Sequence, residues 1–205
     1  GGRAVIQRNI AYLTALQTGE RLPGDGEMSA FYDASHVDNV ENVQASAYTV
    51  RRAVTADLPA VEAFVVAHWG SARQVINGEL VEPAAFSCFV AQRAEELIGL
   101  ASFRVEGATC QLLLLNSLEP GLGMGRRLVD AVADAARGAG CRRMTVVTTN
   151  DNLPALRFYQ RYGFVIHAVR PNALAAARRL KPEIPAVGVD DIPLRDEIEL
   201  ELKLA

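Results

Sequence analysis

Gly121-Leu122-Gly123-Met124-Gly125-Arg126-Arg127-Leu128 joins an apolar stretch to an amphipathic one, and its three glycines decide how the rest of the chain is interpreted. Alternating glycines let backbone N–H groups converge without obstruction by side chains. The helix expected after them adds the positive end of its dipole, so a phosphate or pyrophosphate is the natural ligand. The spacing differs from that of a dinucleotide-binding fold, and no Gly-Lys-Ser/Thr ends the segment as in a nucleotide P-loop. A turn that only allows close packing of helix and strand is the structural alternative.

The sequence on both sides of the glycines alternates between patterns typical of strands and of helices. Residues 86–116 predict an antiparallel three-stranded meander, whereas residues 70–85 predict a second short helix or a loop. A strictly alternating C-terminal stretch predicts a half-buried antiparallel strand. Together the patterns predict a sheet with helices packed on it: strands at 48–54, 86–92, 96–106, 109–116, 144–149, 164–170 and 196–204, and helices at 58–68, 124–137 and 154–162.

Length and composition predict one globular domain with an extension. The chain has 205 residues, of which 50% are hydrophobic and 22% charged. No window approaches the roughly 18 uninterrupted apolar residues of a membrane helix, and no charged segment followed by an apolar one opens the sequence, so a cytoplasmic protein without a membrane partner is expected. Residues 1–47 form an N-terminal extension, with a possible short helix at 4–18 followed by a loop or arm, and residues 48–205 form the main domain.

Charge is unevenly distributed. Residues 119–181 hold eleven Lys or Arg side chains against four Asp or Glu, although the whole chain has a formal charge of −3. This segment is therefore a candidate for binding an anion. A nucleic-acid partner is not expected, because the basic residues lack interleaved exposed aromatic side chains.

The metal-ligating residue types are few and scattered. Cys88, Cys110 and Cys141 are too far apart for a zinc site or a disulfide framework and are interpreted as small buried hydrophobic residues. His36 and His167 have no partner at the spacing of metal ligands. No metal site is predicted.

A second motif runs from Asn152 to Phe164. Asn152 precedes an expected helix, and Tyr159 lies one turn from its end. A helix N-cap is a sufficient structural role for Asn152, and a core aromatic with its hydroxyl at the rim is one for Tyr159. Either motif alone is therefore weak evidence for a function.

The two motifs together resemble the GNAT acetyltransferase superfamily: Gly-x-Gly-x-Gly opens one helix, and Asn-x-x-Ala-x-x-Phe-Tyr-x-x-x-Gly-Phe follows. The resemblance covers residues 48–205 in the same element order. It implies an α/β (α+β) fold with a mixed, mostly antiparallel central sheet and flanking helices. A subgroup of uncharacterised GNAT proteins is also similar in three further segments, 148–152, 179–182 and 192–200.

The resemblance implies acetyl-CoA as cosubstrate and assigns roles to particular residues. The pyrophosphate would lie on the backbone amides of the glycine loop, and the pantetheine arm would run along the end of the strand at 109–116. Asn152 would bond the pantetheine arm, and Tyr159 would be the general acid for the departing thiolate. The cofactor-binding residues implied are Leu115, Ser117, Gly121, Leu122, Gly123, Met124, Gly125, Arg126, Arg127 and Asn152.

The general base is the point at which this chain departs from the family. Many members have a Glu on the central strand, and the matching position here is Gln111, whose neutral amide cannot accept the proton. A water relay or another group would have to serve. Asp196, Glu197 and His68 are the candidates, each with a structural alternative: a solvated acidic strand face for the carboxylates and a helix-end residue for the histidine.

Two functions follow. The first is N-acetyl transfer from acetyl-CoA to a primary amine of a small molecule or a protein, by direct attack of the amine on the thioester. The second, suggested by Gln111, is a GNAT fold that binds acyl-CoA as a sensor or interaction module without turnover. The acceptor pocket is expected at the first helix, residues 70–85 and the connection 171–195. A homodimer contact is possible through an exposed C-terminal strand or the segment 4–18.

Overall fold

The structure, a computed structural model, describes residues 48–119 and 121–204. The predicted N-terminal extension, 1–47, with its helix at 4–18, lies outside the described residues. The α-helices are α2 (Leu58–Trp69), α3 (Met124–Gly138), α4 (Leu153–Tyr162) and α5 (Ala173–Leu180). The strands are β1 (Thr49–Arg52), β2 (Gln74–Ile76), β3 (Glu79–Val81), β4 (Ser87–Arg93), β5 (Glu96–Glu106), β6 (Thr109–Ser117), β7 (Arg143–Thr149), β8 (Val165–Arg170) and β9 (Glu197–Lys203).

Seven strands form the central sheet, in the order β1-β4-β5-β6-β7-β9-β8. The pair β6–β7 is parallel and the other neighbouring pairs are antiparallel. The predicted mixed, mostly antiparallel sheet is thus confirmed, as is the meander of β4, β5 and β6. Cys88, Cys110 and Cys141 are buried free thiols, as predicted.

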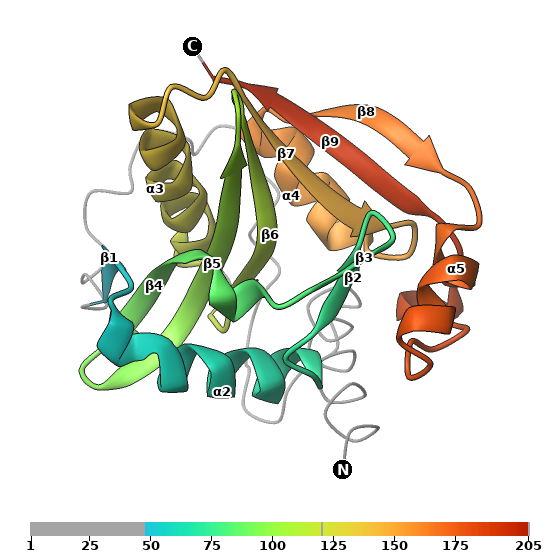
Figure 1. Cartoon of the computed structure of the whole chain (residues 1–205), viewed down its shortest axis with the longest axis horizontal. Coiled ribbons are helices and arrows are strands. Elements are labelled where there is room, and N and C mark those ends of the chain that lie inside the picture. Colours follow the sequence, from blue (N-terminus) through green and yellow to red (C-terminus); the bar gives the residue numbers. More distant parts are fainter. Residues whose placement is uncertain (1–47, 120, 205) are drawn as a thin grey trace, which may run out of the picture.

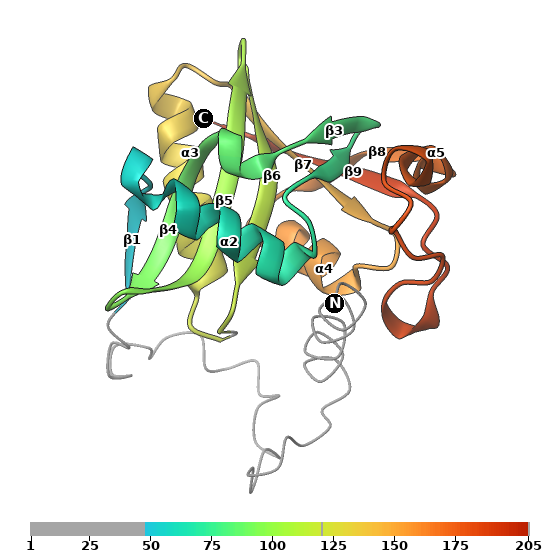
Figure 2. The same ribbon diagram turned by 60° about the horizontal axis from the view of Figure 1, so that its bottom comes forward.

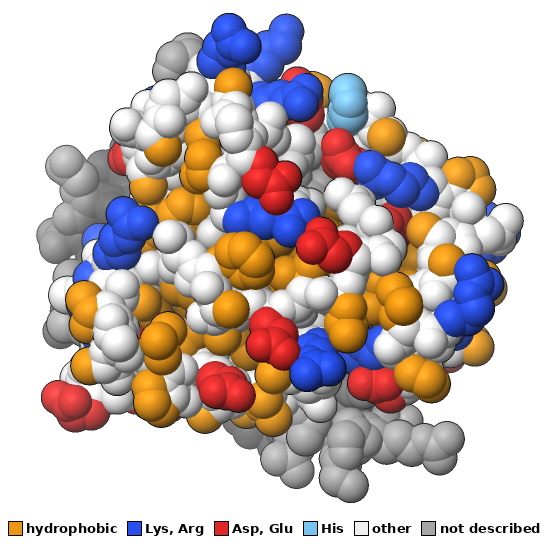
Figure 3. All heavy atoms as spheres, in the orientation of Figure 1, with side chains coloured by type: hydrophobic (Ala, Val, Ile, Leu, Met, Phe, Trp, Pro, Cys, Tyr) orange, Lys and Arg blue, Asp and Glu red, His pale blue; other side chains and the backbone are white. Residues whose placement is uncertain are grey.

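Helices cover both faces of the sheet (Figures 1 and 2). On one face, α3 places Leu128, Val132 and Ala136 at a spacing of four residues, so all three point into the main core. On the other face, α2 buries Val61, Phe64 and Val65 against β4, β5 and β6. Acidic and basic side chains alternate across this second face, with apolar side chains between them (Figure 3).

Within residues 70–85, Gln74–Val81 form a β-hairpin that was not predicted, and the predicted short helix is present only as a 3₁₀ helix at Pro83–Ala85. β2 and β3 pair in an antiparallel register that brings Ile76 opposite Glu79. Asn77 and Gly78 form the turn with φ of 54° and 76°, the left-handed conformation that an Asn-Gly hairpin turn requires. Asn-Gly between Val75-Ile76 and Leu80-Val81 is the signal in the sequence that identifies this hairpin.

The connection between β8 and β9 contains the unpredicted helix α5 and packs against the end of β7. Asn150 Oδ1 accepts the backbone N–H groups of Arg195 and Asp196, at 2.9 and 2.8 Å. Asp151 is buried and accepts the backbone N–H of Val189 at 3.0 Å. Two of the three segments shared with the GNAT subgroup are therefore in direct contact.

The C-terminal strand is internal. β9 pairs with β7 on one side and with β8 on the other, so the expected dimer contact through an exposed C-terminal strand is wrong. The edge of the sheet at this end is β8, where Val165, Ile166 and Val169 are exposed. Within the described residues, no helix combines the length and apolar character needed to cross a membrane.

Gly188 is expected to tolerate no side chain. A Cβ at this position would lie 1.9 Å from Asp151 Oδ2. Gly188→Ala would therefore displace the buried carboxylate that holds Val189, and we expect the free energy of unfolding to fall by about 1–3 kcal/mol. Gly138→Ala is the control, because no atom lies within 4 Å of its added Cβ and it ends α3. Denaturant unfolding that ranks Gly188→Ala as stable as Gly138→Ala would contradict the close contact.

Candidate active site

A gap opens between the two parallel strands at the centre of the sheet. β6 and β7 pair from Thr109 to Leu112 and from Arg143 to Val146, and their register ends there. A β-bulge lies at this point: Ser102 pairs with Leu114 and Phe103 with Leu112, so Leu113 has no partner on β5. A bulge bends the strand that carries it, and beyond it β6 and β7 diverge.

The diverging part of β6 turns backbone groups toward the gap. The N–H of Leu118 bonds to Ile98 O on the β5 side, at 2.9 Å. Backbone groups along an antiparallel strand alternate between its two sides. The N–H and C=O groups of Leu115 and Ser117 therefore face the gap, where an extended ligand would find strand-like hydrogen-bond partners.

The glycine loop leads from the end of β6 into α3. Gly121 and Gly123 have φ of 83° and 67°, and the amides of Met124, Gly125 and Arg126, in the first turn of α3, have no partner within the helix. Tyr48 donates a hydrogen bond to Leu122 O at 3.1 Å, and this fixes the loop against β1.

Two exposed guanidinium groups stand beside the loop. Arg126 lies 5.3 Å from the ring centroid of Tyr162, and Arg127 lies 4.8 Å from that of Tyr48. Cation–π contacts of this kind orient an arginine without neutralising it. The loop thus combines amide donors, the positive end of the helix and two cations, which together suit a polyphosphate.

Asn152 and Tyr159 both belong to α4. Asn152 is the N-cap, and its Oδ1 accepts the N–H of Ala155 at 3.2 Å. Tyr159 is buried among Phe158 and Phe164, with edge-on ring contacts to both. Within the described residues its hydroxyl has no hydrogen-bond partner, and burial raises the pKa of the phenol. The phenol therefore stays protonated at neutral pH.

Gln111 holds a structural position. It is buried, and its Oε1 accepts a hydrogen bond from Arg104 Nε at 2.8 Å. The same guanidinium forms ion pairs with Glu79 at 3.0 Å and with Glu106 at 3.2 Å. Gln111 thus links the central sheet to the β2–β3 hairpin through Arg104.

Asp196 and Glu197 are adjacent but have opposite environments. Asp196 accepts the N–H of Asn172 at 2.8 Å and hydrogen bonds from Arg195, which lower the pKa of its carboxyl. Glu197 is 3% exposed and its Oε2 has no partner among the described residues. Burial raises the pKa of Glu197, partly offset by Arg170 and by the N–H of Asn77.

Glu197 lies one strand away from the gap. It pairs with Thr149, three residues beyond Val146, the last β7 residue paired with β6. His68 lies at the end of α2 with its ring 4.4 Å from that of Phe64, and burial lowers its pKa. Of the three candidate bases, Asp196 has its carboxylate bound by other groups, whereas Glu197 has one buried oxygen that no group among residues 48–119 and 121–204 binds.

Three residues near this site were not identified from the sequence. Arg170 donates to Glu199, and its Nη1 is buried without a partner among the described residues. Asn77 contacts Glu197 through its backbone, and Lys181 binds the other end of the same hairpin. The similarity of residues 179–182 to the GNAT subgroup was the signal for Lys181; for Arg170 and Asn77 only the three-dimensional pairing places them here.

Comparison with known proteins assigns the family. The model of the acetyltransferase (GNAT) family matches residues 53–164. The chain is 38% identical over 136 residues to the Bacillus subtilis (strain 168) "uncharacterized protein YdhI". The aligned residues make up 66% of this chain and 85% of YdhI. The chain therefore belongs to the GNAT acetyltransferase family.

Solved structures share the fold. YncA, described as a putative acetyltransferase from Salmonella typhimurium with its cofactor acetyl-CoA, has a TM-score of 0.56 at 22% identity, covering 78% of this chain and 95% of that one. A Bacillus subtilis acetyltransferase in complex with CoA has a TM-score of 0.55 at 18% identity, covering 78% of this chain and all of that one.

Proposed function

We propose that residues 48–205 transfer the acetyl group of acetyl-CoA to a primary amine of a small molecule or a protein. The observation that carries the proposal is the gap between β6 and β7, with the glycine loop at its mouth and, on α4, the Tyr159 hydroxyl, which has no hydrogen-bond partner within the described residues. The acetyl-CoA in the YncA structure and the CoA in the Bacillus subtilis acetyltransferase support it.

The residues fit the cosubstrate in three places. The first-turn amides of α3, with Arg126 and Arg127 beside them, would hold the pyrophosphate. The backbone groups of Leu115 and Ser117 would bond the amides of the pantetheine arm, as a neighbouring strand would. Asn152 would reach the same arm through its side-chain N–H₂, because its Oδ1 is used by the cap.

The reaction needs a proton donor and a proton acceptor. Acetyl-CoA supplies the activated acetyl group, and the amine nitrogen forms a bond to the carbonyl carbon as the carbon–sulfur bond breaks. Tyr159 gives its hydroxyl proton to the leaving sulfur, a role that a protonated phenol can fill at neutral pH. The proton that the nitrogen loses passes to a base.

Glu197 is the base favoured by its surroundings. Burial raises the pKa of Glu197 and brings it closer to the working pH, where a general base is most effective. Its Oε2, which has no partner in the described part of the chain, can accept a proton directly or through a water molecule. Asp196 is less suited, because Arg195 and Asn172 stabilise its charge, and His68 is the third candidate.

The neutral amide of Gln111 supports a second candidate function. A GNAT fold without a base would bind acyl-CoA as a sensor or interaction module. Thiol release with acetyl-CoA and a panel of amines supports transfer, whereas a CoA-dependent rise in melting temperature without thiol release on any amine favours the module.

Gly123→Ala should weaken CoA binding. Gly123 has φ of 67° and precedes α3, and no atom lies within 4 Å of an added Cβ. A methyl group there would strain the left-handed backbone of the loop and occupy the open space in which the pyrophosphate would lie, so we expect calorimetry to show a roughly tenfold or larger loss of CoA affinity, about 1.4 kcal/mol or more. Gly140→Ala is the matched control: φ is 79°, the space is equally open, and the position follows the far end of α3. Equal CoA affinities of the two variants would contradict the placement of the pyrophosphate on this loop.

Tyr159→Phe should lower kcat on the order of tenfold to a thousandfold and leave CoA affinity nearly unchanged, because it removes a proton donor but keeps the buried ring. Tyr162→Phe is the control: it removes the other hydroxyl of α4, which donates to Asp130 at 2.6 Å. Steady-state kinetics in which Tyr159→Phe retains full kcat would remove Tyr159 from the mechanism.

Glu197→Gln should remove the acidic limb of the pH profile of kcat/KM. Glu197 accepts a proton only when ionised, so the rate rises with pH through its pKa, and burial places that limb above the value of about 4.3 for an exposed glutamate. We expect kcat to fall about 10²-fold to 10⁴-fold. Glu201→Gln is the control. Glu201 lies four residues further along β9 on the same face and forms an ion pair with Arg143, so this variant should keep the acidic limb. If the acidic limb remains in Glu197→Gln but is lost in Asp196→Asn or in His68→Gln, the base is Asp196 or His68 and not Glu197.

A further inference from the structure

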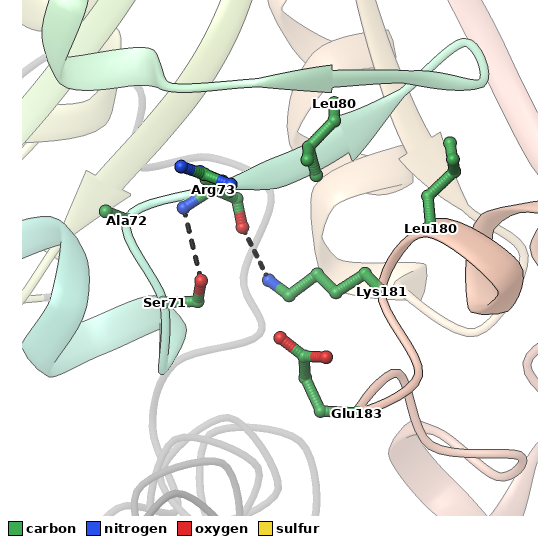
Figure 4. Close-up of a pocket in the computed structure, with 7 residues that line it drawn as sticks. All are labelled: Ser71, Ala72, Arg73, Leu80, Leu180, Lys181 and Glu183. Carbon is green, nitrogen blue, oxygen red and sulfur yellow. Dashed lines mark hydrogen bonds between the residues drawn. The ribbon is translucent and has the colours of Figure 1, made fainter.

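A pocket of about 380 Å³ lies between the loop after α2, the β2–β3 hairpin and the end of α5 (Figure 4). Two segments that are far apart in the sequence form it, and both were expected to build the acceptor side. Its volume suits a small metabolite. The residues that line it are Ser71, Ala72, Arg73, Leu80, Leu180, Lys181 and Glu183.

Lys181 gives the pocket a buried cation. The residue is 8% exposed, and its ammonium donates to Arg73 O at 2.7 Å and to Gln74 Oε1 at 3.1 Å. An ammonium has three N–H donors, so within the described residues one remains for a ligand. An anionic oxygen is the partner that gives a buried ammonium its strongest hydrogen bond.

Glu183 and two leucines complete a set of three chemical features. The Glu183 carboxylate points toward Lys181 in Figure 4, but within the described residues the two form no ion pair. Burial lowers the pKa of the Lys181 ammonium, and the negative charge of Glu183 offsets part of that shift. Leu80 and Leu180 are 40% and 49% exposed and offer an apolar wall. Arg73 is turned to Glu82, at 2.8 Å. Cation, anion and apolar surface lie side by side.

We propose that this pocket binds the acceptor and that the acceptor is a free α-amino acid with an aliphatic side chain. Its carboxylate contacts Lys181, its ammonium contacts Glu183, and its side chain lies on Leu80 and Leu180. The inference rests on the proposed acetyl transfer. The β2–β3 hairpin borders both places: Lys181 donates to Arg73 O and Gln74 Oε1 at its base, and Ile76 and Val81 of the hairpin pack on Leu113, where the gap begins.

Four matched ligands test the charges: leucine, leucinamide without the carboxylate, 4-methylpentanoate without the amine, and 3-methylbutylamine without the carboxylate or its carbonyl. NMR titration of the intact chain with CoA present should show leucine binding at least tenfold more tightly than the other three. Leucinamide also stands for a peptide-linked residue, so equal binding of leucine and leucinamide would favour a peptide acceptor and overturn the proposal.

Two variants test which side chain is responsible for each ligand preference. Lys181→Gln should abolish the preference for leucine over leucinamide, and Glu183→Gln the preference for leucine over 4-methylpentanoate. Arg179→Gln removes an exposed charge from α5 outside the pocket and should keep both preferences. A general loss of structure would weaken all ligands together and could not remove one preference alone; variants that keep both preferences would overturn the assignment.

Turnover separates this inference from the proposed function. Acetylation of leucine with a kcat/KM at least tenfold above that of leucinamide supports both. Acetylation of other amines but not of leucine would refute the amino acid as acceptor and leave acetyl transfer intact. Selective leucine binding without thiol release on any amine would refute acetyl transfer and leave only the binding site.

Discussion

The short parallel ladder between β6 and β7 is the constraint on which the rest of the structure depends. Four residue pairs hold the two halves of the sheet together, and the bulge at Leu113 ends the ladder. Backbone groups beyond it need partners, because unpaired polar groups are costly once water is excluded. The gap is stable because both sides are supported: β5 holds β6 over its whole length, and β9 holds β7 as far as Thr149. A ligand with strand-like amides would complete the pairing that the fold leaves open.

The β2–β3 hairpin is secured by polar contacts to three other elements. Arg104 on β5 pairs with Glu79, the backbone N–H of Asn77 partly offsets the raised pKa of Glu197 on β9, and Lys181 after α5 donates to Arg73 and Gln74. Between these contacts Ile76 and Val81 pack on Leu113, the residue of the bulge. The hairpin therefore contacts the pocket, the bulge and the surroundings of the candidate base.

Much of the fold was predictable because its elements have strong local signals. The strands of the meander, the glycine loop and the cap of α4 each depend on residues that are near neighbours in sequence. The hairpin had an equally local signal, Asn77-Gly78, and α5 an alanine-rich one, but the prolines around α5 favoured a connection. The environment of Glu197 was not predictable, since it depends on Arg170, Asn77 and Thr149, which only the sheet register brings together.

That register also explains why a base would lie on β9 and not at position 111. A glutamate in place of Gln111 would face Arg104, and an adjacent guanidinium lowers the pKa of a carboxyl and weakens it as a base. Arg104 already balances Glu79 and Glu106, and the neutral amide of Gln111 adds no third negative charge. Glu197 has the reverse arrangement: the guanidinium of Arg170 donates to Glu199, so desolvation outweighs attraction and the pKa of Glu197 rises. Gln at position 111 thus suits the ion pairs of Arg104, and the raised pKa of Glu197 suits the proposed role of general base.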